Sequence, residues 1–496
     1  MPNQAMNGLF FSEVFGLDRS VLAEQGAFDV SLVNDLPLFI DPFLLFHSKN
    51  PQYQQLHRLM IDYLRFLRDQ SATSRNDDGL LKAWYCFPEI KQNWLGFSLT
   101  GNRGSGLGLR FARELRDNLH VVFSDFGREQ ITAGSHIEKV CLVRDGIGRD
   151  NISDFVTNLI QNFLCRYTER LAKVHLTPQQ VREVSIGRAM FNYTTQMWER
   201  RTYLLPWTNG DHVILTPRDI LTRDETWINR KDLLQNFGDI PSAIPDAELR
   251  AAVMNYFWTQ LSLRRPMGTT PKSDDRTEAA AATIRHYPQL VDYYIRLKED
   301  NGDNAKTQSA ERVVATEIIF SQRLRDLLLP LLVQGEFGKQ PCSTYGETHA
   351  RLAYLKHVIE DKGGWRIFYH EGRPIERESD LQILFRLVWF GTMSDAGSEA
   401  NDGRGPVDFK ISRGREKTLV EMKLASNSKL EVNLRKQLEI YKTSAGAQTG
   451  IYVIIYFTAQ QRVRVEEILK KVASSKNADI VLIDARNDNK TSASAA

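Results

Sequence analysis

Three residues in the C-terminal part of the chain combine types and spacing that could perform metal-dependent hydrolysis. Asp408 lies in the stretch GPVDFKI, and Glu421 and Lys423 lie in the stretch TLVEMKL. Carboxylate oxygens are the ligands that Mg²⁺ prefers, and this ion usually takes only one or two of them from a protein. A lysine beside such a pair could orient the attacking water and offset charge in the transition state. The three residues therefore predict a hydrolytic site that acts on phosphate esters.

The alternation of residues on both sides of these positions predicts a β-hairpin. Residues 405–411 and 418–424 alternate with period two, and the polar segment SRGREK connects them. A turn centred between Gly414 and Arg415 would place Asp408 opposite Glu421, with their Cβ atoms about 4.5–5.5 Å apart. Both acids and Lys423 would then share the face opposite the core. Because opposed carboxylates repel unless a cation lies between them, this register favours a metal ion at the site.

This arrangement resembles the PD-(D/E)xK nuclease superfamily. The resemblance covers about the last quarter of the chain, and here the proline of the family's Pro-Asp pair is displaced by one residue to Pro406. It implies that Asp408 and Glu421 bind Mg²⁺, with Mn²⁺ as a substitute, and that Lys423 serves the attacking water. It also implies two further catalytic residues: Gln437 on the helix after the hairpin, and an acid on the preceding helix. The sequence offers two acids for that preceding helix, with Glu378 as the first choice and Glu376 as the second.

The segments that follow the hairpin fit the core of the same family. Residues 450–457 and 479–483 have the composition of strands, and residues 462–472 have helical spacing. The resulting order, α-β-β-α-β-α-β, implies a C-terminal α/β domain of the restriction-endonuclease-like fold with a central mixed sheet.

Basic side chains surround the hairpin. They could bind backbone phosphates without reading sequence, or they could solvate the hairpin surface. The candidates for nucleic-acid binding are Arg404, Arg413, Arg415, Lys429, Arg435 and Lys436.

The function that these residues predict is a Mg²⁺-dependent nuclease that cuts DNA, and the resemblance implies an effector of restriction or anti-phage defence. Two alternatives remain open: an inactive nuclease-like module that binds nucleic acid or serves in an assembly, and a nuclease directed at RNA. Because two strands need two sites, many nucleases of this fold act as dimers, so the resemblance also implies a homo-oligomer. Partner proteins encoded by neighbouring genes are a further expectation.

The chain is long enough, at 496 residues, for roughly three domains. We expect an α+β recognition or sensor domain of unknown function at 1–262 and a linker with a helical connector at 263–350. We expect the nuclease-like domain at 351–486 and a disordered tail at 487–496. The stretch LRRPMGTTPKSDDRTE sets the first boundary, because it is rich in proline, glycine and charge with little to bury.

A glycine-rich segment in the N-terminal region invites a ligand. A strand-like run leads into Gly101, Gly104, Gly106 and Gly108, and an amphipathic helix follows. Such a loop before a helix could cradle phosphate with its backbone N–H groups. A tight surface turn is the simpler interpretation, because the lysine and serine of a P-loop are missing.

Composition bounds the remaining classes. The formal net charge is +3, and the C-terminal part carries the excess of basic residues. No apolar run approaches the length of a membrane span, and the start of the sequence lacks the features of a secretory signal. The four cysteines form no CxxC pair, which predicts a reducing, cytoplasmic location and no cysteine-based zinc site.

Overall fold

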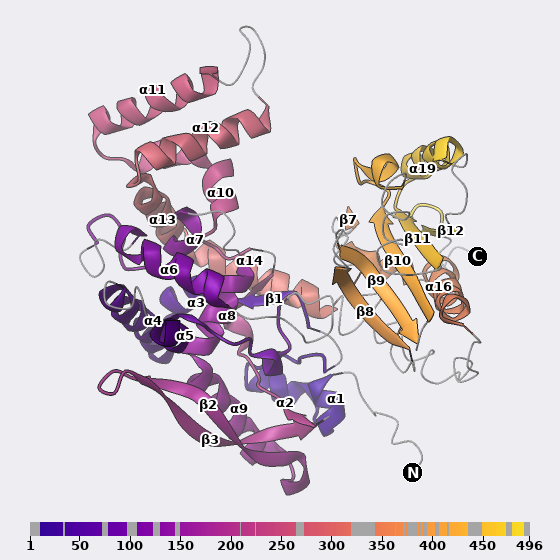
Figure 1. Cartoon of the computed structure of the whole chain (residues 1–496), viewed down its shortest axis with the longest axis horizontal. Coiled ribbons are helices and arrows are strands. Elements are labelled where there is room, and N and C mark those ends of the chain that lie inside the picture. The colour runs from indigo at the N-terminus through magenta and orange to yellow at the C-terminus, as the bar shows by residue number, and fades with distance from the viewer. Residues whose placement is uncertain are drawn as a thin grey trace. The chain divides into compact units, whose positions relative to one another are not determined.

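The computed structural model describes most of the chain. The described residues are 10–32, 35–71, 78–96, 107–122, 129–143, 149–208, 210–223, 225–263, 272–318, 343–362, 364–370, 373–374, 382, 385, 389, 394–401, 406–413, 416–434, 449–472 and 479–490. The chain forms two compact units (Figure 1). The N-terminal unit ends at Val314 and the C-terminal unit begins at Ala315.

The N-terminal unit is mainly helical. Its helices are α1 (Phe11–Phe15), α2 (Arg19–Glu24), α3 (Pro42–Phe46), α4 (Pro51–Gln70), α5 (Asp78–Tyr85), α6 (Leu109–Val122), α7 (Lys139–Val143), α8 (Arg149–Leu159), α9 (Gln161–His175), α10 (Arg230–Gln235), α11 (Ala247–Leu263), α12 (Ser273–His286), α13 (Leu290–Asp300) and α14 (Gly302–Glu317). The sequence explains the longest of them. Asn50 caps α4 by accepting from the N–H of Gln52, and Pro51 occupies the first turn, where no N–H is needed.

Two small sheets complete this unit. Strands β2 (Val181–Asn192), β3 (Met197–Thr208) and β4 (Asp211–His212) form an antiparallel sheet in that order. Strands β1 (Leu38–Ile40) and β5 (Leu221–Arg223) form an antiparallel pair. The α+β prediction for this region is confirmed.

The predicted boundary at residue 263 does not separate two units. Apolar residues of α11 and α12 belong to one core cluster, which includes Phe257, Leu261, Ala280 and Ile284. The Pro- and Gly-rich stretch therefore joins two helices that share one core. The sequence suggested a boundary because α12 contributes mainly small alanines to that core. The predicted connector is therefore divided, and its helices up to Val314 belong to the N-terminal unit.

The C-terminal unit contains a five-stranded mixed sheet. Its strands are β8 (Asp395–Asn401), β9 (Pro406–Arg413), β10 (Glu416–Leu424), β11 (Thr449–Tyr456) and β12 (Asp479–Asp484), in the order β12-β11-β10-β9-β8. Strands β8, β9 and β10 pair antiparallel, whereas β10, β11 and β12 pair parallel. The strands predicted from alternation and apolar runs, and the mixed sheet, are confirmed. Strand β8 escapes sequence analysis because DAGSEAN carries no apolar alternation.

Helices cover both faces of this sheet. Helix α16 (Thr344–Asp361) reaches one face, where the Thr344 hydroxyl bonds the Thr418 hydroxyl of β10. Helix α19 (Ala459–Val472) packs Val465 and Ile468 on Tyr452 of the other face. A short hairpin, β6 (Tyr369–His370) and β7 (Arg373–Pro374), lies between α16 and the sheet strands in sequence. The predicted domain start at 351 falls inside α16, so the unit begins earlier than predicted.

The first part of the predicted disordered tail is fixed to the unit. Asn489 donates to Asp484 Oδ2 at 3.0 Å, and Lys490 Nζ donates to the backbone oxygen of Glu360 at 3.1 Å. Residues 491–496 lie outside the described residues. Across the described part of the chain, no helix is both long and apolar enough to cross a bilayer.

Candidate active site

The hairpin of β9 and β10 has the register that the sequence predicts. The observed pairs run from Arg413↔Glu416 to Phe409↔Val420, so the next position along brings Asp408 level with Glu421. Beyond that point β9 stays with β8, where Val407 pairs with Ala400. At this position the backbone N–H of Asp408 donates to a side-chain oxygen, Glu421 Oε2, at 3.3 Å. The acids therefore meet where β9 and β10 stop pairing.

Asp408, Glu421 and Lys423 converge on one place. Lys423 Nζ lies 3.0 Å from Glu421 Oε1 and 3.5 Å from Asp408 Oδ2. Asp408 Oδ2 also accepts the N–H of Met422 at 2.6 Å, which fixes the carboxylate over the edge of β10. Among the described side chains, this cluster brings together two carboxylates and one ammonium group.

The sequence predicts that the face carrying these residues lies opposite the core. In the structure, this face is also covered by apolar residues. Glu421 pairs across the parallel ladder with Tyr452, and Lys423 pairs with Ile454. Both partners belong to a second apolar cluster beneath α19. The exposed fractions of the side chains are 13% for Asp408, 3% for Glu421 and 8% for Lys423. The prediction failed because alternation within a hairpin identifies one core face and gives no information about what helices cover the other.

Burial changes the acid–base chemistry of the cluster. Burial, and secondly the neighbouring charge of Asp408, raise the pKa of Glu421 to about 7, although Lys423 opposes the shift. A buried carboxylate beside another acid is costly to ionise without a compensating cation. A metal ion would supply that compensation and would bind in competition with a proton.

Gln382 is a site residue that sequence analysis missed. Its Nε2 donates to Asp408 Oδ1 at 2.6 Å, and the residue is buried. Three positions along, Phe385 packs against Phe409, with the ring centres 4.7 Å apart. A single amide within the apolar stretch LQILF was the available signal. The other two predicted catalytic residues, Glu378 and Gln437, and the second choice Glu376, lie outside the described residues.

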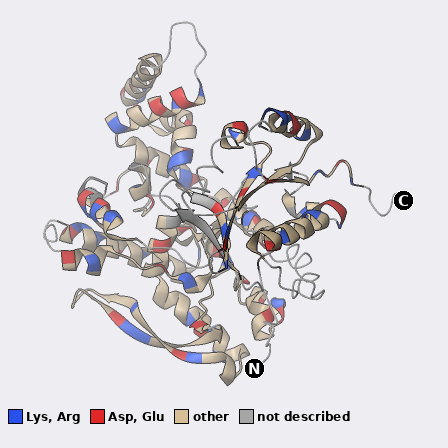
Figure 2. Cartoon of the chain, turned by 45° about the vertical axis from the view of Figure 1, so that its right-hand side comes forward, with Lys and Arg blue, Asp and Glu red and all other residues tan. Residues whose placement is uncertain are grey.

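The predicted phosphate-binding residues have different surroundings. Arg413 ion-pairs with the buried Glu347 of α16, and its Nε donates to Ser394 Oγ at 3.1 Å. This guanidinium is thereby committed to a structural network. Lys429 is exposed in the turn after β10. Arg404, Arg415, Arg435 and Lys436 lie outside the described residues. The sequence analysis did not include α19 among the candidates for nucleic-acid binding. Basic residues recur along this helix (Figure 2), including Lys470 and Lys471 in its last turn.

The glycine-rich segment is described at one of its four glycines. Gly108 immediately precedes α6, and the expected helix is confirmed over Leu109–Val122. Before it, Leu107 exchanges two backbone hydrogen bonds with Phe87. Gly101, Gly104 and Gly106 lie outside the described residues, so phosphate binding there stays a prediction.

The described donor set suits a hard cation with few protein ligands. In the described residues, no group of three or more histidine, cysteine or acidic side chains is arranged to hold a metal ion. Asp408 and Glu421 instead form a pair of oxygen ligands, which is the number that Mg²⁺ commonly takes from a protein. The remaining positions around such an ion would be left to water and substrate.

Comparison with known families finds two matches. Residues 16–229 match the model of a Domain of unknown function (DUF8370), and residues 344–459 match that of a Domain of unknown function (DUF8371). The second match begins with α16 and ends at the start of α19, so it includes Asp408, Glu421 and Lys423. No curated protein and no solved structure matches the chain.

Proposed function

We propose that the C-terminal unit is a Mg²⁺-dependent nuclease of the PD-(D/E)xK type that hydrolyses phosphodiester bonds in DNA. The observation that carries this proposal is the convergence of Asp408, Glu421 and Lys423 where β9 and β10 part. The order of the strands and the mixed sheet agree with the resemblance in the sequence. The wider role, an effector of restriction or anti-phage defence, rests on that resemblance alone.

Asp408 and Glu421 are the residues that would hold the metal ion. Their oxygens are hard ligands, and two neighbouring carboxylates that repel each other are stabilised by a cation bound between them. When bound, Mg²⁺ would supply Lewis-acid activation of water and stabilisation of charge on the phosphate. The bound cation would then offset the free-energy cost of ionising the buried Glu421.

The residues around the pair have distinct roles in this proposal. Lys423 places an ammonium within 3.5 Å of both carboxylates, where it can orient the attacking water and offset charge on the phosphate. Gln382 and the N–H of Met422 hold the two oxygens of Asp408 in place.

A cleavage assay on the full chain tests the proposal. Supercoiled plasmid is incubated with the protein and Mg²⁺, with Mn²⁺, and with EDTA. The Asp408→Asn and Lys423→Met variants are compared with Glu466→Gln, a matched acid-to-amide change in an exposed ion pair of α19. We expect metal-dependent cleavage in the wild type and in Glu466→Gln, and a loss of at least about 100-fold in the two site variants.

The same assay separates the competing functions. Cleavage that survives Asp408→Asn or Lys423→Met would show that the site is not the catalytic one. DNA binding that weakens steeply with salt, without product in any metal, would favour an inactive binding module. Cleavage of RNA but not of plasmid, with the same dependence on Asp408, would keep the mechanism and change the substrate.

A further inference from the structure

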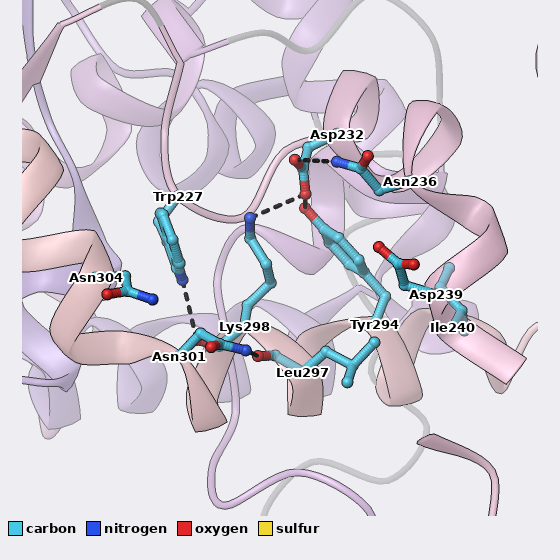
Figure 3. Close-up of a pocket in the computed structure, with 10 residues that line it drawn as sticks. All are labelled: Trp227, Asp232, Asn236, Asp239, Ile240, Tyr294, Leu297, Lys298, Asn301 and Asn304. Carbon is cyan, nitrogen blue, oxygen red and sulfur yellow. Dashed lines mark hydrogen bonds and ion pairs between the residues drawn. The ribbon is translucent and has the colours of Figure 1, made fainter. Parts of the chain in front are cut away.

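The N-terminal unit contains a cavity that is independent of the proposed nuclease site. It measures about 230 Å³ and opens between α10 and α13 (Figure 3). Its walls include two aromatic side chains, Trp227 and Tyr294, and three charged ones, Asp232, Asp239 and Lys298. None of these was singled out by the sequence.

One half of the cavity already holds an ammonium group. Lys298 Nζ lies 4.0 Å from the centre of the Trp227 ring and 5.7 Å from that of Tyr294. It also pairs with Asp232 Oδ2 at 2.9 Å. Aromatic faces and a carboxylate around a cation are the elements of an aromatic cage. The chain's own lysine therefore shows which chemistry this wall stabilises.

The cage is rigidly built. Trp227 is fixed at both ends, because its indole N–H donates to the backbone oxygen of Lys298 at 3.0 Å and its backbone N–H donates to the buried Asp41 at 2.7 Å. The buried Tyr294 donates its hydroxyl to Asp232 Oδ2 at 2.9 Å. A ligand would thus meet a preformed surface, which lowers the entropy cost of binding.

The other half of the cavity has a carboxylate at its open side. Asp239 is exposed, its carboxylate forms no hydrogen bond or ion pair with the described residues, and Figure 3 shows it on the opposite side of Tyr294 from Lys298. The lining contains two acids and one lysine, and that lysine is paired with Asp232. This balance disfavours a phosphate ligand and favours a cation. The half-buried apolar side chain of Leu297 also lines the cavity and could contact the carbon chain of a ligand.

We propose that this cavity binds an organic cation through Asp239, with an alkylammonium or guanidinium head and a short apolar stem. The head could belong to a free diamine or to a basic side chain of a peptide, because both present the same chemistry. The cavity volume suits a small molecule or a single side chain rather than a folded partner.

Thermal unfolding and calorimetric titration of the full chain test this site. The probes are 1,5-diaminopentane, Nα-acetyl-lysine amide, the neutral 1,5-pentanediol and inorganic phosphate, at constant ionic strength. We expect saturable stabilisation by one or both amines and none by the diol or phosphate. The amine that binds more tightly identifies the source, since the diamine represents a free metabolite and the blocked lysine represents a peptide side chain.

Variants test whether the amines bind at this cavity. Asp239→Asn should weaken amine binding about tenfold or more, because one charge-assisted hydrogen bond is lost. Glu248→Gln, an exposed acid in the first turn of α11, should leave amine binding unchanged. Lys298→Ala should lower the unfolding temperature, and a monoamine such as butylamine should restore part of it by refilling the cage.

The outcomes decide the proposal without reference to DNA cleavage. Equal amine affinity in wild type and Asp239→Asn would overturn it, as would stabilisation by phosphate. Failure of butylamine to rescue a folded Lys298→Ala variant would remove the argument from the cage. Loss of amine binding in Asp239→Asn with metal binding at Asp408 unaffected would support it.

Discussion

Two clusters of buried charge lie on opposite faces of the C-terminal sheet, and their charges are balanced in opposite ways. On the α16 face, Glu347 accepts both Nε and Nη2 of Arg351 at 3.1 and 3.0 Å, and also Ser394 Oγ at 2.7 Å. Arg413 completes this cluster. One carboxylate therefore has two guanidinium partners, and both of its oxygens are used.

The cluster on the α19 face has the reverse composition. In the described part of the chain, Asp408 and Glu421 both pair with the ammonium of Lys423. Burial, and secondly the charge of Asp408, raise the pKa of Glu421 to about 7, which is the expected response of a carboxylate that is removed from water beside another acid. The comparison teaches that the described residues of one cluster pair a carboxylate with two guanidinium groups, whereas those of the proposed active site pair two carboxylates with one ammonium, which is the composition that a metal ion would complement.

The largest expected effect comes from breaking the satisfied cluster. Glu347→Gln leaves Arg351 buried without its carboxylate, so we expect the free energy of unfolding to fall by about 3 kcal/mol. Differential scanning calorimetry of the full chain measures the change. Glu466→Gln, in an ion pair whose side chains are 51% and 45% exposed, should change stability by less than about 1 kcal/mol. Equal effects of the two substitutions would contradict the comparison.

The matched change in the other cluster should have the opposite sign. Glu421→Gln mimics the protonated form that the buried site favours, and we expect it to stabilise the metal-free protein by about 2 kcal/mol at pH 8. The raised pKa means that the wild type has its full stability contribution below pH 4.5 and loses it as the pH rises through about 7. The gain should therefore vanish near pH 4.5. Unfolding curves in EDTA at both pH values measure the difference in stability between Glu421→Gln and the wild type. If Glu421→Gln destabilises the protein at pH 8, the raised pKa of Glu421 is refuted.

The sequence predicts the local features of the two clusters but not their long-range contacts. Alternation around Asp408 and Glu421 predicts the hairpin and its register, because a strand has an exact period of two and a short connection leaves few registers. Charge balance cannot be obtained this way, since Glu347 is far from Arg413 in sequence and no local pattern joins them. The contact of Gln382 with Asp408 is equally non-local. Cover by α19 depends on packing of a helix that follows the site by many residues.

Metal affinity should depend on pH because the ion competes with a proton on Glu421. Below pH 7 we expect Mn²⁺ affinity to rise about tenfold for each pH unit, and to level off above it. Titration calorimetry at pH 6, 7 and 8, in buffers of different ionisation enthalpy, measures both the affinity and the proton released. An affinity that stays constant across this range would mean that Glu421 is not a ligand.

A smaller effect is expected for the residue that holds Asp408. Gln382→Ala removes a 2.6 Å hydrogen bond from Asp408 Oδ1, and we expect metal affinity to fall about tenfold, because outer residues orient metal ligands. Gln382→Glu should weaken binding less at low pH, where the added carboxyl can still donate. If Gln382→Ala binds metal as the wild type does, the amide is a packing residue with no part in the site.

The smallest effect concerns nucleic-acid contacts outside both clusters. Lys429→Ala should lower DNA affinity by about two- to threefold and reduce the salt dependence by about one ion. Fluorescence anisotropy at several salt concentrations measures both. Arg413→Gln offers the contrast, because its guanidinium is bound to Glu347, and it should affect stability more than DNA affinity.

Direct measurement of Mn²⁺ binding by electron paramagnetic resonance tests the central claim, that Asp408 and Glu421 together hold a divalent ion. The account predicts that the wild type and Glu466→Gln each bind an ion at this site at pH 8, and that folded Asp408→Asn and Glu421→Gln proteins lose it. Identical Mn²⁺ binding in Asp408→Asn, or no binding by a folded wild type, would contradict it.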